Sequence, residues 1–80
     1  MRSLSGKRYW LVGASEGLGA ALAQRMSAAG AHVILSARSE ARLTAVASTL
    51  SGSCSCEPVD VTDMASVRAA AKRIGAVDGL

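Results

Sequence analysis

The sequence predicts an α/β fold on a doubly wound parallel sheet, of which these eighty residues form the N-terminal portion. Three observations support this prediction. Short apolar runs alternate three times with amphipathic runs of about 12 residues, glycine or serine turns separate them, and the apolar runs lack strict polar alternation. Strands of a parallel sheet lose that alternation because helices cover both of its faces.

The first half of the chain predicts two strand–helix pairs. Residues 8–12 predict a buried strand in which Trp10 is expected in the core, and a helix over 18–29 stops at Gly30. The apolar stripe of this helix is Leu18, Leu22 and Met26, with Ala21 and Ala29 beside it. A second strand over 31–37 leads to a helix over 40–50, for which Ser39 is the expected N-cap. The apolar face of that helix is Leu43, Val46, Ala47 and Leu50.

The second half predicts a third strand, a third helix and the opening of a fourth strand. The third strand is expected within 53–61, where Pro58 favours an edge position because proline cannot donate to an inner ladder. Thr62 or Asp63 caps a helix that runs to Ile74 and stops at Gly75. Its apolar positions are Met64, Val67, Ala71 and Ile74. If the strand that opens over 76–80 lies beside the first strand, the third helix crosses to the opposite face.

Composition narrows the classes of protein. Half of the residues are apolar and 19% are charged, which is typical of a packed chain. The apolar share consists largely of small residues, so we expect residues 1–80 to be a single, incomplete domain of something larger. We expect a cytoplasmic protein, because no apolar run reaches about 18 residues and the chain does not open on a secretory signal. The net charge is +3, and the cationic group Arg2, Lys7 and Arg8 is expected to be solvated rather than to bind nucleic acid.

The turn after the first strand carries the first functional signal. Gly13, Gly17 and Gly19 lie between a strand and a helix, where backbone N–H groups and the positive helix end can bind a phosphate. Ser15 and the backbone of Leu18 would add donors. Glycines occur in many turns, and it is the strand–turn–helix–strand context that makes this signal informative.

The end of the second strand indicates which dinucleotide binds. Sites for NAD carry an acidic residue there, whereas this chain has Ala37 followed by Arg38. A guanidinium offers a planar set of donors to phosphate oxygens, and Ser39 could add a hydroxyl or an amide. This favours NADP over NAD as the cofactor. The alternative is that Arg38 is merely a solvated loop residue.

Together these segments resemble the N-terminal part of the short-chain dehydrogenase/reductase family, over essentially the whole chain. The similar segments are the glycine loop 12–19, the strand end 36–39, the stretch 60–63 and the lead-in 77–80. The resemblance implies a Rossmann-type fold and hydride transfer between NADP(H) and a carbonyl or alcohol substrate. It implies that Asp60 accepts a hydrogen bond from the adenine amino group, and that Val61 meets adenine through its backbone and apolar side. It also implies a homo-oligomeric full-length protein.

The sequence departs from the family pattern in three ways. Val12 replaces the usual threonine, and Glu16 stands where NADP-preferring members often carry arginine or lysine. The family's catalytic serine, its Tyr-x3-Lys pair and its Asn-Asn-Ala-Gly run are not among these residues. Tyr9 is no substitute, since it precedes the glycine loop and no lysine follows it at four residues. We therefore expect no catalytic residue in this segment, and no activity from it alone.

Two other function classes stay open: a non-catalytic NADP-binding module, and an interaction fragment whose open sheet edge pairs with a second chain. A metal site is not expected. Cys54 and Cys56 are expected to be small core or edge residues, and His32 a satisfied residue near a strand start.

Overall fold

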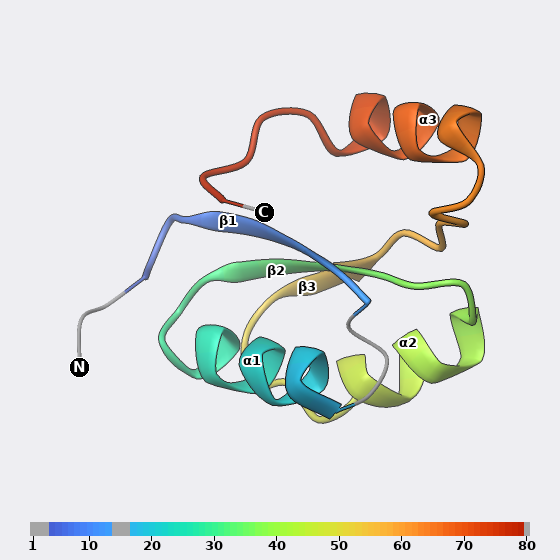
Figure 1. Cartoon of the computed structure of the whole chain (residues 1–80). Coiled ribbons are helices and arrows are strands. Elements are labelled where there is room, and N and C mark those ends of the chain that lie inside the picture. The colour runs from blue at the N-terminus through green and yellow to red at the C-terminus, as the bar shows by residue number, and fades with distance from the viewer. Residues whose placement is uncertain (1–3, 14–16, 80) are drawn as a thin grey trace.

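Three parallel strands form a sheet in the order β1-β2-β3 within residues 4–13 and 17–79, the part of the chain that the computed structural model describes. The strands are β1 (Arg8–Val12), β2 (His32–Ser36) and β3 (Cys54–Cys56). The helices are α1 (Gly17–Ala28), α2 (Glu40–Ala47) and α3 (Met64–Ile74). Helices α1 and α2 cover one face of the sheet and α3 covers the other (Figure 1).

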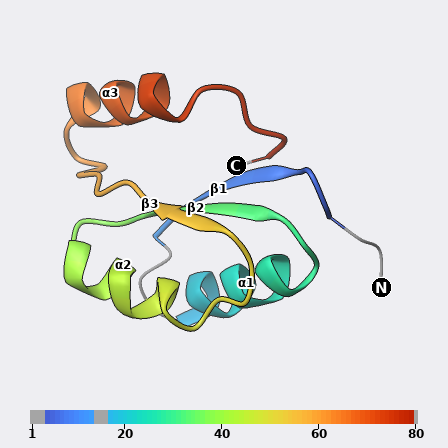
Figure 2. The same cartoon turned by 180° about the vertical axis from the view of Figure 1, so that it is seen from behind.

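The strand register establishes the doubly wound order. β1 pairs with β2 from Arg8 opposite His32 to Val12 opposite Ser36, and β2 pairs with β3 on its other side. On the free side of β1, Tyr9 forms a parallel bridge with Gly79. The chain therefore returns across α3 to place the start of a fourth strand beside the first, as predicted (Figure 2).

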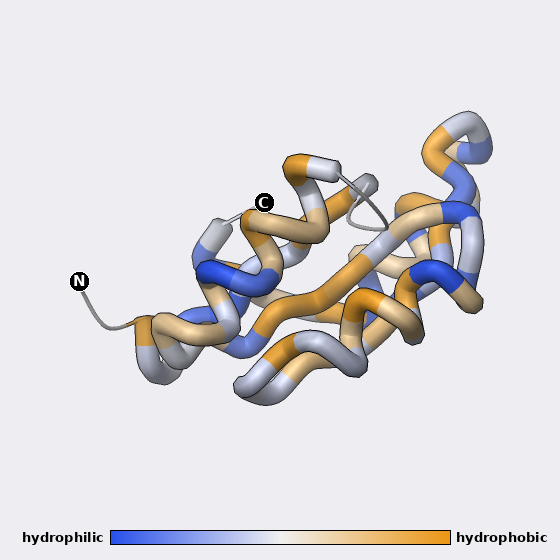
Figure 3. The backbone as a smooth tube through the Cα atoms, turned by 90° about the horizontal axis from the view of Figure 1, so that it is seen from below, coloured by the Kyte–Doolittle hydropathy of each residue, from blue (hydrophilic) through white to orange (hydrophobic). Residues whose placement is uncertain are grey.

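Each face of the sheet has its own apolar core, because successive residues of a strand point to opposite faces. On the α1/α2 face, Val33 and Leu35 of β2 are fully buried. On the α3 face, Ile34 packs with Trp10, Val59, Ala70 and Ile74. Trp10 is thus in the core as predicted. Figure 3 shows hydrophobic stretches running through the strands in the middle of the molecule. The central strand β2 contributes buried residues to both cores.

The apolar face predicted for α1 is wrong at Leu18, at Leu22 and at Ala21, which is also exposed. Leu18 is 90% exposed and Leu22 is 47% exposed, whereas Ala23 and Ser27 are buried. Small side chains let α1 lie close to the sheet, and the Ser27 hydroxyl accepts a hydrogen bond from the backbone N–H of Gly52 at 2.8 Å. The large leucines consequently lie on the side of the helix that faces away from the sheet.

The third strand is shorter than the predicted range, yet its edge position is confirmed. Beyond β3, the backbone N–H groups of Glu57 and Val59 still donate to the carbonyls of Leu35 and Ala37, at 2.8 and 3.0 Å. Pro58 lies between them, where its missing donor faces away from β2. Hydrogen bonding to β2 therefore continues along one side of this segment toward the carboxyl end of the sheet.

The helix ends follow the capping predictions more closely than the helix faces do. Ser39 caps α2, because its side chain accepts a hydrogen bond from Arg42 N. The cap of α3 is Asp63 rather than Thr62, and the Asp63 side chain accepts from Ala65 N. The last predicted turn of α2 is not helical, since the helix ends at Ala47. In α3, Ala70 and Ile74 are buried with Val67 packed beside them, but Met64 and Ala71 are exposed, contrary to the predicted face.

Arg8 corrects a second expectation, since its side chain is not simply solvated. Its guanidinium donates to the carbonyls of Ala76 and Ile74 at 2.6 and 2.8 Å, and its backbone N–H donates to the Asp78 carboxylate at 2.8 Å. A cation at this place complements the negative end of α3. Arg8 thereby fastens the chain after α3 to the first strand.

The other singled-out residues take the places expected for them. The ring nitrogens of His32 lie 2.9 and 3.0 Å from the hydroxyls of Ser53 and Ser55, so this histidine is satisfied. Cys54 and Cys56 are half-buried free thiols at the sheet edge. Burial raises the pKa of the Cys56 thiol, with Cys54 and Glu40 adding to the effect. The described residues hold no group of three metal-ligating side chains and no helix of membrane-spanning length and apolarity.

We predict that Ser36→Ala destabilises the protein, because the buried Trp10 indole N–H donates to the Ser36 hydroxyl at 2.7 Å and would lose its partner. The expected loss is about 1–3 kcal/mol in the free energy of unfolding, measured by urea denaturation. Ser48→Ala is the control, since that hydroxyl is exposed and donates to the carbonyl of Ala45. Equal effects of the two variants would contradict the prediction.

We also predict that Arg8→Met lowers the free energy of unfolding by about 1.5–3 kcal/mol, because it keeps the aliphatic stem but removes two charged donors. Lys7→Met removes the same charge from the exposed neighbouring residue and should change stability little. The measurement is again urea denaturation. A Lys7 variant as unstable as the Arg8 variant would show that charge, and not the contact with the end of α3, accounts for the loss.

Candidate functional site

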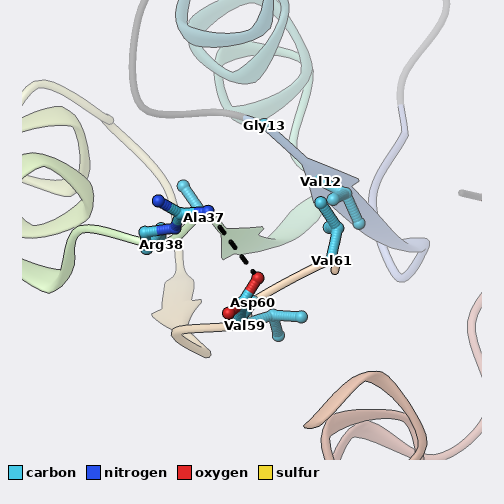
Figure 4. A pocket seen from close by; sticks show the side chains of 7 residues that line it. All are labelled: Val12, Gly13, Ala37, Arg38, Val59, Asp60 and Val61. Carbon is cyan, nitrogen blue, oxygen red and sulfur yellow. Dashed lines mark ion pairs between the residues drawn. The ribbon is translucent and has the colours of Figure 1, made fainter. Parts of the chain in front are cut away.

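A cavity of about 190 Å³ opens at the carboxyl ends of the strands. This edge is where open parallel sheets bind ligands, next to the point at which the strand order reverses. Its lining comes from the ends of β1 and β2 and from the segment after β3 (Figure 4). The lining residues are Val12, Gly13, Ala37, Arg38, Val59, Asp60 and Val61.

Backbone hydrogen bonds bring these segments together. The N–H of Gly13 donates to the Ser36 carbonyl at 2.7 Å, which joins the end of β1 to the end of β2. The bond from Val59 N to the Ala37 carbonyl brings the third segment to the same edge. Val12, Val59 and Val61 thus give the cavity apolar walls.

Gly13 directly follows β1, and Gly17 begins α1. Gly13 and Gly17 have φ angles of +81° and +61°, a region that favours glycine, and a Cβ at either would meet no atom within 4 Å. Gly17, Leu18 and Gly19 form the first turn of α1, whose leading N–H groups have no partner within the helix. This arrangement suits an anion. Ser15 and Glu16 lie outside the described residues.

Arg38 and Ser39 follow β2 directly. The Arg38 side chain is 79% exposed, and its Nη2 lies 3.9 Å from Oδ1 of Asp60 across the mouth of the cavity (Figure 4). The Ser39 hydroxyl accepts from the backbone N–H of Arg42 at 3.3 Å and can still donate its own proton. Arg38 therefore presents donors at the opening, whereas Ser39 caps α2 and does not line the cavity. No acidic side chain follows β2 directly.

Asp60 is held by its neighbour Thr62. The hydroxyl and the backbone N–H of Thr62 donate to Oδ1 of Asp60 at 2.6 and 3.0 Å. These two bonds, with a smaller contribution from the Arg38 guanidinium, hold the pKa of the Asp60 carboxyl below its ordinary value. Asp60 is consequently an ionised acceptor at neutral pH.

The residues that line the cavity suit part of a nucleotide. Sites that enclose whole drug-sized ligands measure roughly 300–1,000 Å³, so this smaller cavity suits one ring system. Its apolar walls suit a base, its carboxylate suits an exocyclic amine, and its guanidinium suits a phosphate on the adjoining sugar. Sequence reasoning did not single out Val59 as a lining residue or the contact of Thr62 with Asp60. Aspartate side chains often accept a hydrogen bond from the backbone N–H two residues on, and this pattern could have indicated the bond from Thr62 N to Asp60.

The sequence matches a known protein family. The sequence pattern described as short chain dehydrogenase matches residues 7–80. A fatty acyl-CoA reductase of Acinetobacter baylyi is 42% identical over 65 residues, which cover 78% of this chain and 22% of that protein. The chain therefore spans less than a quarter of the length of this relative.

Solved structures agree with the sequence match. A metagenomic short-chain oxidoreductase in complex with NADP superposes with a TM-score of 0.86 at 32% identity, covering 89% of this chain and 34% of that one. The RhlG/NADP active-site complex of Pseudomonas aeruginosa gives 0.84 at 35% identity, covering 91% and 29%. The Rossmann-type sheet order and the match over residues 7–80 lead to one conclusion: the chain belongs to the short chain dehydrogenase family.

Proposed function

We propose that this chain is the NADP(H)-binding part of an oxidoreductase that transfers hydride between NADP(H) and a carbonyl or alcohol substrate. The observation that carries the proposal is the cavity at the strand ends, flanked by the exposed Arg38 guanidinium and the Asp60 carboxylate. The NADP complexes among the similar structures support it. When bound, the cofactor supplies or accepts the hydride.

The cavity receives adenine in this proposal. Val12, Val59 and Val61 contact the faces of the ring, and burying those apolar surfaces favours binding. The Asp60 carboxylate accepts a hydrogen bond from the exocyclic amino group. Because a carboxylate only accepts, it selects a base that presents a donor at this position.

Two groups of residues would hold the phosphates. The backbone N–H groups at the start of α1 would bind the pyrophosphate. We propose from the sequence that the Ser15 hydroxyl adds a donor. Arg38 binds the 2′-phosphate of NADP with help from Ser39. Glu16 belongs to the same turn, and its charge would oppose the 2′-phosphate if it faced it.

This proposal gives no residue of the chain a proton-transfer role. Tyr9 lies in β1, where its backbone bridges to Gly79, and it does not line the cavity. The residues named here bind and orient the cofactor.

We further propose that the protein is cytoplasmic, since two free thiols suit a reducing compartment. By family resemblance, we also expect a homo-oligomer.

We predict that Arg38→Gln weakens binding of NADP⁺ about 10- to 100-fold, because it removes charge-assisted hydrogen bonds worth roughly 1.5–3 kcal/mol. Binding of NAD⁺, which has no 2′-phosphate, should change far less. Calorimetric titration of the whole protein with both dinucleotides measures the ratio.

Arg68→Gln is the matched control, because Arg68 is an exposed arginine of α3 that does not line the cavity. It should leave both affinities unchanged. If Arg38→Gln preserves the ratio of NADP⁺ to NAD⁺ affinity, Arg38 has no part in cofactor selection.

A second prediction compares Asp60→Asn with Asp63→Asn. The Asp60 change should weaken both dinucleotides by a similar factor of about 3–30, because both contain adenine and the amide would present a donor to its amino group. Asp63→Asn removes an equal charge three residues along, and asparagine still caps a helix well. Affinity that is equally reduced in both variants would indicate a general charge effect.

The lowered pKa of Asp60 sets the expected pH dependence. The Asp60 carboxylate is ionised at every pH above its ordinary pKa. Its contribution to dinucleotide binding is lost only when the pH falls through the lowered pKa. We therefore expect NAD⁺ affinity to stay constant between about pH 5 and pH 8. NAD⁺ is the probe because the 2′-phosphate of NADP⁺ itself titrates near about pH 6. An inflection for NAD⁺ in this range that disappears in Asp60→Asn would contradict the expectation.

A further inference from the structure

Among the described residues, the polar contacts of the Asp60 side chain converge on one of its two oxygens. Oδ1 accepts from the hydroxyl and the backbone N–H of Thr62 and lies 3.9 Å from Nη2 of Arg38. Within residues 4–13 and 17–79, Oδ2 accepts no hydrogen bond. The carboxylate therefore has one occupied oxygen and one oxygen left for a ligand.

Thr62 is itself held in place by the turn that contains it. The backbone N–H of Asp63 donates to the carbonyl of Asp60 at 3.0 Å, which closes the turn around Thr62. Asp63 then caps α3, and the N–H of Asp60 donates to the Ser66 hydroxyl of that helix at 3.3 Å. The Thr62 hydroxyl thus reaches Oδ1 from a position fixed at both ends.

We propose that Thr62 is a positioning residue, which fixes Oδ1 of Asp60 and so leaves Oδ2 to discriminate between a 6-amino and a 6-oxo purine. This inference rests on the proposed function, because it assumes that the cavity binds the base of a nicotinamide dinucleotide. It assigns no catalytic role to Thr62.

The discrimination follows from hydrogen-bond polarity. Adenine presents an amino donor at position 6, which an ionised carboxylate accepts. Hypoxanthine presents a carbonyl oxygen there, and two acceptors facing each other at this site repel. A carboxylate that is free to rotate could avoid the carbonyl, so selectivity depends on what holds the carboxylate.

Arg38 is the group that would turn a released carboxylate. Its guanidinium is already within 4 Å of Oδ1, and a bidentate pair is the geometry that guanidinium and carboxylate prefer. Without the Thr62 hydroxyl, Asp60 could rotate into that pair and occupy both of its oxygens. The same rotation would draw Arg38 away from a 2′-phosphate.

The test measures the affinities of the full-length protein for NADP⁺ and for nicotinamide hypoxanthine dinucleotide phosphate by calorimetry. The wild type should prefer NADP⁺ by about 10-fold or more. Thr62→Val keeps the shape of the side chain and the backbone N–H but removes the hydroxyl donor. We expect it to reduce this preference about 3- to 10-fold, as should Thr62→Ala. Thr62→Ser should restore it.

Two further variants calibrate the measurement. Thr44→Val makes the same chemical change at an exposed threonine of α2 whose hydroxyl donates to the Glu40 carbonyl, and it should leave the preference unchanged. Asp60→Asn should shift the preference toward the hypoxanthine dinucleotide, because its amide places a donor opposite the 6-oxo group.

The outcomes separate this inference from the proposed function. If the wild type binds NADP⁺ with no preference over the hypoxanthine analogue, or if both Thr62→Val and Thr62→Ala match Thr44→Val, the inference is overturned while the cofactor proposal stands. If the wild type binds neither NADP⁺ nor NAD⁺, the proposed function itself fails. A purely structural role for Thr62 would lower the melting temperature without changing the ratio of the two affinities, and this result also overturns the inference.

Discussion

The hydrogen bond from Gly13 N to the Ser36 carbonyl, which joins the carboxyl ends of β1 and β2, is the contact on which the site depends. Among the described residues, this hydrogen bond is the last one between the two segments, and the glycine turn that leads to α1 begins at Gly13. The side chain of Ser36 accepts from the buried Trp10 indole at the same place. One residue of the central strand therefore links the α3-side core to the backbone at the cavity.

The polar groups at the two ends of the sheet differ in what they contact. At the amino end of β1, Arg8 and Asp78 tie the chain after α3 to the first strand, and this brings Gly79 beside Tyr9. The backbone N–H, Nη1 and Nη2 of Arg8 each donate to an acceptor of the segment 74–78. At the carboxyl end, the Arg38 guanidinium is exposed and lies 3.9 Å from Oδ1 of Asp60. Thr62 holds that same oxygen, and no described residue donates a hydrogen bond to Oδ2.

Much of the candidate site could be predicted from the sequence, because its parts follow strand ends. Parallel strands bring their carboxyl ends to one edge, so Gly13, Arg38 and Asp60 were expected to gather there. Thr62 was expected only as a possible helix cap. Its contact with Asp60 depends on the rotamer and the turn that the chain adopts, and several turns are compatible with the same residues.

The sequence by itself determined the order of the elements, the cap at Ser39 and the choice of Thr62 or Asp63 as the cap of the third helix. Each depends on interactions within a few residues, which local residue types encode. Only the tertiary structure decided that α1 buries Ala23 and Ser27 and exposes Leu18, and that Arg8 binds the carbonyls after α3. The side of a helix that faces the sheet depends on how closely the two backbones approach, and the partners of Arg8 lie more than sixty residues away in sequence.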